Sequence, residues 1–146
     1  MTAFAFRETV PAPTIITSAF GNGSTVWTDK EVGKAVKLSA TDDSTMVLAG
    51  EDDDIIGFVK AIAIGTVNGG FSHGSVQIEG WMEAVVGANQ ATALVPGDFV
   101  VADDQAAVGT AGSAKVKKAA GRSCWRVMRI VSGTGVAGST VLIYEF

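Results

Sequence analysis

The densest group of chemically competent side chains is the run Glu-Asp-Asp-Asp at residues 51–54, which leads into the pair Ile55 and Ile56. Carboxylates in such a run can hold a metal ion, transfer protons or keep a turn hydrated. An EF-hand calcium loop starting at Asp52 fails, because Ile56 and Ala63 fall where oxygen ligands are required. Adjacent carboxylates on an extended chain also point to opposite faces. We therefore expect a solvated turn before a long strand, with a weak cation site as the alternative.

The only histidine, His73, lies between Ser72 and Ser75 in a glycine-flanked segment. Nucleophilic catalysis needs a nucleophile, a base and an orienting carboxylate that converge in space. The sequence has no G-x-S-x-G elbow and no phosphate-binding glycine motif. We expect His73 at an exposed loop tip, and a small hydrolase using Ser72 or Ser75 stays as a third-ranked hypothesis.

The single cysteine, Cys124, excludes an internal disulfide and a C-x-x-C site. It lies in the apolar run CWRVMRIV, where we expect a buried, inert thiol. A zinc site would have only His73 and Cys124 as nitrogen or sulfur ligands. The sequence thus predicts no catalytic residue, no metal and no cofactor, which argues against an enzyme.

Composition limits the partners. The net charge is −4, so nucleic acid is not an expected partner. We expect the one short basic cluster to be a solvated strand end. It consists of Lys115, Lys117, Lys118 and Arg122. The longest uncharged stretch, 61–78, is interrupted by glycines, and the N-terminus lacks signal-peptide character, so no membrane is expected.

Mean hydropathy is +0.33, which is high for a small soluble monomer. A chain of 146 residues with 47% apolar and 18% charged residues is expected to fold, as one domain. It has too little interior to hide so much apolar surface. Some of that surface is therefore expected to contact a partner or further copies of the chain.

The 18 glycines separate short apolar runs, which is typical of an all-β domain. We predict a compact Gly-rich β-sandwich or barrel of about eight strands. Gly80 should mark a bulge or bend, and a capping box from Thr28 to Glu31 predicts one helical turn that Gly33 ends. The predicted strands cover residues 34–39, 45–49, 55–64, 75–86, 98–102, 114–118, 123–131 and 139–146.

Residues 1–18 differ from the rest, because they contain Pro11 and Pro13 but no glycine. We expect an extended N-terminal arm over 1–18 and a single β domain over 19–146, the alternative being that the arm is a first edge strand of that domain. Phe4 and Phe6 alternate with small residues, which suits strand addition to a partner. Of the three tryptophans, Trp27 beside the glycine-rich 21–24 segment is the favoured partner contact, although core is the default.

A weak internal echo links two segments. GKAVKL at 33–38, followed by Asp42 and Asp43, resembles GDFVVA at 97–102, followed by Asp103 and Asp104. Matches this short do not establish a duplication. They do favour acidic pairs as turn residues, because aspartate tolerates tight turns.

Residues 21–146 resemble the small capsid decoration, or cement, proteins of tailed bacteriophages. The phrases that carry the resemblance are GKAVKL at 33–38, IGFV at 56–59 and VPGDFV at 95–100. The resemblance implies a β-rich, often trimeric protein without an active site, which binds the outside of the mature head and holds neighbouring major capsid subunits together.

The expected partners are thus the major capsid protein and further copies of the chain in a homotrimer, and the expected location is the outer capsid surface of the virion. The alternative is a head-fibre or tail module that binds a receptor or glycan, which predicts exposed aromatics in a groove. Candidate capsid or inter-subunit contacts are Phe4, Phe6, Ile15, Ile16 and Trp27.

Overall fold

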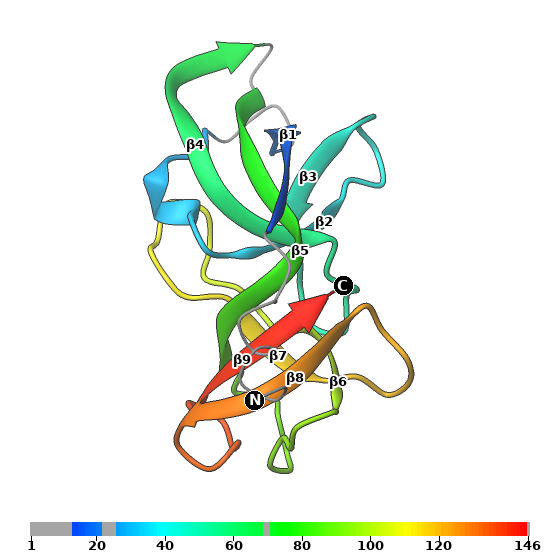
Figure 1. Ribbon diagram of the computed structural model, residues 1–146. Coiled ribbons are helices and arrows are strands. Elements are labelled where there is room, and N and C mark those ends of the chain that lie inside the picture. The colour runs from blue at the N-terminus through cyan, green and yellow to red at the C-terminus, as the bar shows by residue number, and fades with distance from the viewer. Residues whose placement is uncertain (1–12, 22–25, 69–70, 146) are drawn as a thin grey trace, which may run out of the picture.

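The computed structural model describes residues 13–21, 26–68 and 71–145. Within these residues the chain forms β-strands and one short 3-10 helix, which confirms the all-β prediction (Figure 1). The elements are β1 Thr14–Phe20, η1 Asp29–Glu31, β2 Ala35–Leu38, β3 Thr45–Leu48, β4 Gly57–Asn68, β5 Phe71–Val86, β6 Phe99–Ala102, β7 Lys115–Lys118, β8 Trp125–Ser132 and β9 Thr140–Glu145.

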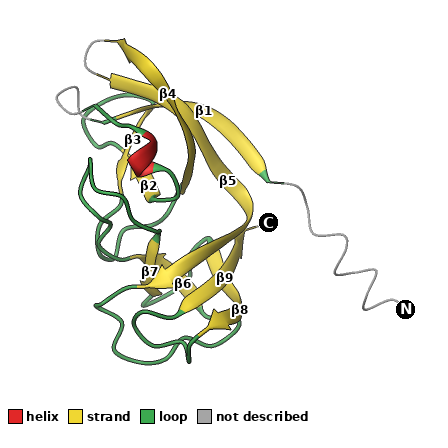
Figure 2. Ribbon diagram, turned by 90° about the vertical axis from the view of Figure 1, so that its left-hand side faces the viewer, coloured by secondary structure: helices red, strands yellow, loops and turns green. Residues whose placement is uncertain are grey.

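The long strand β5 belongs to two closed rings of strands. Its first half pairs with β1 and β4, which are joined through β3 and β2, and we name this ring barrel 1. Its second half pairs with β9 and β7, which are joined through β8 and β6, and this ring is barrel 2. Figures 1 and 2 show β5 running from one group of strands into the other.

Gly80 lies where β5 exchanges its partner strand. Thr14 of β1 is opposite Glu79, and Glu145 of β9 is opposite Gly80. Gly80 has φ +101, a conformation that side chains other than glycine rarely adopt. The position of the expected bulge or bend is therefore the boundary between the two barrels.

The two barrels have the same topology. In each, the first strand runs parallel to the third, and the remaining pairs are antiparallel. The register agrees as well, since Phe20 pairs with Met46 as Val86 pairs with Val116. Even an irregularity recurs, because the register shifts after Val59 in β4 and after Val127 in β8. Barrel 2 is therefore a structural repeat of barrel 1.

The sequence echo marks equivalent strands of this repeat. Residues 35–38 of the first phrase form β2 and residues 99–102 of the second form β6, which are the second strands of barrels 1 and 2. The acidic pairs do not correspond. Asp42 and Asp43 lie in the turn between β2 and β3, whereas Asp103 follows β6 directly and is buried.

Each barrel has its own core, and the two cores touch. Inside barrel 1 the ring of Phe20 stacks on that of Trp27 with centroids 4.9 Å apart. The core of barrel 2 surrounds Trp125, and Phe58 of β4 reaches it edge-on at 4.8 Å. Because side chains alternate along β4, Val59 points into barrel 1 while Phe58 joins the core of barrel 2. Burying a phenylalanine in this way stabilises the fold by about 2 kcal/mol.

The predicted helical turn is confirmed as η1. Thr28 and Glu31 form both bonds of the capping box. Glu31 is fully buried and forms an ion pair with Lys34 at 3.3 Å. The Gly109 N–H donates to the Glu31 carboxylate, and Lys34 Nζ donates to the Ala107 carbonyl at 3.0 Å. This buried pair therefore anchors the loop between β6 and β7 onto barrel 1.

Two boundaries differ from the expectation. The arm was expected to end at residue 18, yet Thr14–Phe20 forms β1 and pairs with β5, so the boundary falls inside a strand. For these residues the alternative of a first strand of the same domain holds, because the β5 backbone offers hydrogen bonds to the segment after Pro13. It is not an edge strand, since β1 also pairs with β3. Phe4 and Phe6 lie outside the described residues. The predicted gap from 65 to 74 is also wrong in part, since β4 extends to Asn68 and β5 begins at Phe71.

Candidate functional site

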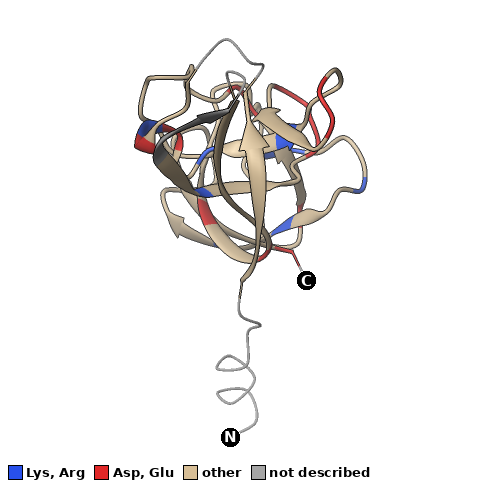
Figure 3. Ribbon diagram, turned by 90° about the horizontal axis from the view of Figure 1, so that it is seen from above, with Lys and Arg blue, Asp and Glu red and all other residues tan. Residues whose placement is uncertain are grey.

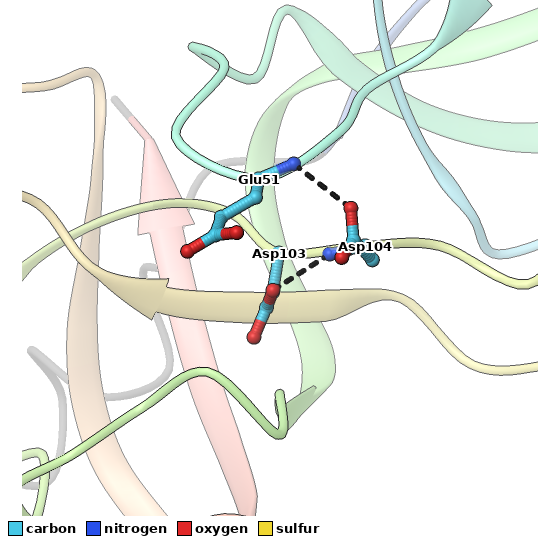
Figure 4. A group of neighbouring side chains, drawn as sticks. All are labelled: Glu51, Asp103 and Asp104. Carbon is cyan, nitrogen blue, oxygen red and sulfur yellow. Dashed lines mark hydrogen bonds between the residues drawn. The ribbon is translucent and has the colours of Figure 1, made fainter.

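The acidic run does form a turn, and it contributes one residue to a carboxylate cluster (Figure 4). Glu51 comes from the turn between β3 and β4, whereas Asp103 and Asp104 follow β6. One oxygen from each carboxylate lies within 4.8 Å of the others. The cluster thus joins a loop of barrel 1 to a loop of barrel 2.

Asp103 is the buried centre of this cluster. Its carboxylate accepts hydrogen bonds from the Asn89 side chain at 2.6 Å, the Asn89 N–H at 3.0 Å and the Asp104 N–H at 2.8 Å. Burial alone would raise the pKa of Asp103, but these hydrogen bonds and the attraction of Lys117 lower it below its ordinary value. Gly87 leaves the necessary room, because a Cβ there would lie 1.9 Å from the Asp103 carboxylate.

The remaining carboxylates have their own partners. Lys117 Nζ lies 2.9 Å from Glu51 and 3.0 Å from Asp52, and Lys37 Nζ lies 2.7 Å from Asp53. Asp104 accepts the Glu51 N–H at 3.3 Å. The negative charge of the cluster is therefore offset by N–H donors and by the Lys117 ammonium group. We call Glu51, Asp103 and Asp104 the acidic junction, because they connect loops of the two barrels.

The basic cluster is thereby divided among separate contacts. Lys117 serves the acidic turn, and Lys118 Nζ lies 3.4 Å from Asp98. Arg122 lies over the ring of Phe99. In the described part of the chain, segments of both charges are interspersed around the molecule, as Figure 3 shows from above. This distribution gives no continuous phosphate track.

The expected loop around His73 is wrong, because residues 72–75 lie within β5. His73 is opposite Ala19 of β1, and Ser72 is opposite Phe20. Ser72 is buried, and its Oγ accepts the Trp27 N–H at 2.8 Å. Consecutive residues of a strand face opposite sides, so Ser72 and His73 do not converge as a nucleophile and its base.

Cys124 is exposed, which corrects the expectation of a buried thiol. It directly precedes β8, so the first inward-facing residue of the apolar run is Trp125 instead. Partial burial, followed by repulsion from Glu145 and Asp54, raises the pKa of the Cys124 thiol. A raised pKa opposes formation of the thiolate, which is the reactive form of cysteine.

The contact candidates separate into two groups. Ile15 and Ile16 are exposed on β1, at 51% and 37%. Trp27 is wrong as a surface contact, because it is 3% exposed and packs on Phe20 in the core of barrel 1. Among the tryptophans it is Trp81 that is exposed, at 48% of its surface. The sequence analysis did not single out this residue.

Trp81 is the counterpart of Ile15 in the structural repeat. Ile15 pairs with Gln77 as Trp81 pairs with Tyr144, and the strands carrying them close their barrels in the same register. Both side chains are about half exposed. Side chains alternate between the two faces of β5, and Ala84 and Val86 point into the core of barrel 2. Trp81 has the opposite parity, so this alternation could have predicted that it points outward.

A row of large side chains continues from Trp81 across barrel 2. Trp81 of β5 is opposite Tyr144 of β9, Tyr144 is opposite Arg126 of β8, and Arg126 is opposite Phe99 of β6. We call these four residues the aromatic–arginine row. The Arg126 guanidinium lies 4.3 Å from the centroid of the Phe99 ring. Sequence reasoning missed this row because its members come from four distant segments.

The row borders a surface hollow. Its lining includes Phe99, Arg126 and Tyr144 from the row, and Arg122 and Glu145 beside it. Burial, and then repulsion from Glu79, raise the pKa of Glu145, while Arg126 opposes this shift. One carboxyl oxygen of Glu145 is buried and has no hydrogen-bond partner among the described residues. The hollow therefore combines two cations, aromatic rings and a carboxyl group.

No family model, no curated protein and no solved structure matches this chain. Among the described residues, no helix has the length and apolar character needed to cross a membrane.

Proposed function

We propose that this chain is a non-enzymatic structural protein of a tailed-bacteriophage virion. In this role it decorates the outside of the head, binds neighbouring major capsid subunits and holds them together, acting with further copies of itself as a homotrimer. The sequence resemblance supports this proposal. The chemistry of the described residues agrees with it, because the carboxylates of the acidic junction and the Ser72 hydroxyl are engaged in the chain's own hydrogen bonds.

The observation that carries the proposal is the repeated outer strand. β1 and the second half of β5 occupy equivalent places in two barrels that share one strand and a packed contact between Phe58 and Trp125. They present Ile15 and Trp81 at equivalent positions. A lattice of identical subunits offers repeated binding sites, and a rigid protein with repeated surfaces can bind two of them at once.

Quantitative mass spectrometry of purified particles tests the proposal. A molar ratio to the major capsid protein near unity, or one that fits a trimer at every three-fold site, is expected. The control is a tail protein of fixed low copy number from the same particles. Absence of the chain from purified particles would overturn a virion role.

A second candidate is favoured by the aromatic–arginine row. Partly exposed Phe99 and Tyr144 line the hollow, and the exposed Trp81 is next in the row, as a head-fibre or tail module with a receptor- or glycan-binding role would present. A handful of copies per particle, together with loss of glycan binding in Trp81→Ala, would favour this function over decoration.

A further inference from the structure

The repeat shows what covers the counterpart of the aromatic–arginine row. The register places Ala35, Phe58 and Gln77 of barrel 1 where barrel 2 has Phe99, Arg126 and Tyr144. All three barrel 1 residues are 0% exposed, and Ala35 and Phe58 belong to the core of barrel 2. This face of a barrel is thus where a second β-structure packs.

In barrel 2 the same face has a different chemistry and is less deeply buried. Arg126 stands where barrel 1 has Phe58, and Phe99 stands where it has Ala35. The row and its surroundings are partly or largely exposed. A face that is fully buried in one repeat and partly exposed in the other indicates a docking surface for another molecule.

The charges specify what that molecule carries. Arg126 and Arg122 lie over the Phe99 ring at 4.3 Å and 5.9 Å from its centroid. Among the described residues, neither guanidinium is within ion-pair distance of a carboxylate. Stacking on a ring fixes a guanidinium while leaving its N–H edge available for two parallel bonds to a carboxylate.

We propose that the aromatic–arginine row, with Arg122, binds an acidic segment of a protein partner, whose carboxylates meet Arg122 and Arg126. Trp, Tyr and Arg are the residues that carry most of the binding energy at protein interfaces. A neutral glycan would use the rings but would offer no carboxylate to the N–H groups of either arginine, which form no ion pair among the described residues. The site lies apart from the acidic junction, and the proposal does not depend on the virion role.

Two synthetic peptides of equal length test this proposal, one alternating Glu and Val and the other alternating Gln and Val. Binding is followed by two-dimensional NMR and by tryptophan emission. Trp27 and Trp125 are buried, so Trp81 is the tryptophan whose emission should respond to a ligand. The Glu peptide is expected to shift the Trp81 indole and Arg126 side-chain signals, with at least about tenfold tighter binding than the Gln peptide.

The matched variants are Arg122→Gln with Arg126→Gln, and Lys30→Gln with Lys60→Gln, which remove the same charge from exposed positions of barrel 1. The arginine variant should weaken binding of the Glu peptide about tenfold or more, and the lysine variant should leave it nearly unchanged. A thermal melt of each variant checks that it is folded. Trp81→Leu, at the other end of the row, should weaken binding without losing the preference for glutamate.

Three results would overturn the proposal. Equal affinity for the Glu and Gln peptides would remove the role of the guanidinium groups. Equal loss in the arginine and lysine variants would reduce the effect to net charge. Binding of a neutral oligosaccharide at Trp81, with no response to the Glu peptide, would assign the row to sugars instead.

Discussion

Gly33 and Gly97 occupy the same position in the two barrels. Each lies just before the second strand, and their φ angles are +92 and +94. The Gly33 N–H donates to the Val59 carbonyl at 2.7 Å, and the Gly97 N–H donates to the Val127 carbonyl at 2.8 Å. The return bonds also match, from Val59 to Lys34 and from Val127 to Asp98. The repeat therefore extends to single hydrogen bonds at a glycine-specific corner.

Replacing either glycine should destabilise the protein by a similar amount. Both have φ values that favour glycine, and an added Cβ would meet nothing within 4 Å, so the cost of Gly33→Ala or Gly97→Ala is conformational. About 1–2 kcal/mol of unfolding free energy should be lost in each case. Urea unfolding measures it, with Gly121→Ala as a control at a glycine without positive φ. A neutral effect at one position and a large one at the other would argue against equivalent corners.

Asp103 should make stability depend on acidity. Its folded-state pKa lies below the ordinary value, so its carboxylate stabilises the fold above that value, and this stabilisation is lost as the pH falls through the folded pKa. Asp103→Asn should cost about 1–3 kcal/mol at pH 7, and the difference from wild type should shrink below about pH 4. Urea unfolding at both pH values checks this. Asp43→Asn, on an exposed turn, is the control, and a pH-independent difference at Asp103 would contradict the assignment.

The buried pair of Glu31 and Lys34 should behave as a unit. Lys34→Met leaves the Glu31 carboxylate buried without its cation and should cost about 3–5 kcal/mol. Combining Lys34→Met with Glu31→Gln should cost less than the sum of the two single changes. A double-mutant cycle by chemical unfolding measures the coupling, with exposed Lys30→Met as the control. Additive losses would show that the two groups stabilise the fold separately.

The two barrels should unfold together. They share β5, and Phe58 of one packs on Trp125 of the other, so neither core is complete alone. Trp27 reports on barrel 1 and Trp125 on barrel 2, and in Trp81→Phe their emission changes should coincide in one urea transition. Phe58→Ala should lower the free energy of unfolding by about 3–5 kcal/mol and shift the midpoint to lower urea, while keeping one transition. Two separate unfolding transitions in Trp81→Phe would show that the two barrels unfold independently.

Local patterns in the sequence predicted the strands well. Periodic apolar runs between glycines predicted all strands from β2 to β9, although their bounds shifted, and the capping box predicted η1. Gly80 was recognised as a special position, and it divides β5 between the barrels. These features depend on residues that are neighbours along the chain, which is why a single sequence reveals them.

The features that escaped prediction depend on distant segments. Residues 14–18 of β1 were assigned to the arm because residues 1–18 contain two prolines and no glycine, yet pairing with β5 decides their structure. Trp27 and Trp81 exchanged roles because Trp27, before η1, packs on Phe20 of β1, whereas Trp81 lies on the outward face of β5. Asp103 became the centre of the acidic junction only through Asn89 and the turn at Glu51, which lie on other loops. The short echo signalled the repeat, but two matches could not show that nine strands close into two rings.

The shared strand makes this architecture extensible. Two separate five-stranded rings would need ten strands, whereas here nine suffice because the last strand of one ring is continuous with the first strand of the next. Each additional ring would require four new strands and would begin at β9, just as barrel 2 begins at β5. Such a ring would also cover Phe99, Arg126 and Tyr144, whose counterparts in barrel 1 are fully buried, so barrel 2 would have to exchange the arginine for an apolar residue such as Phe58.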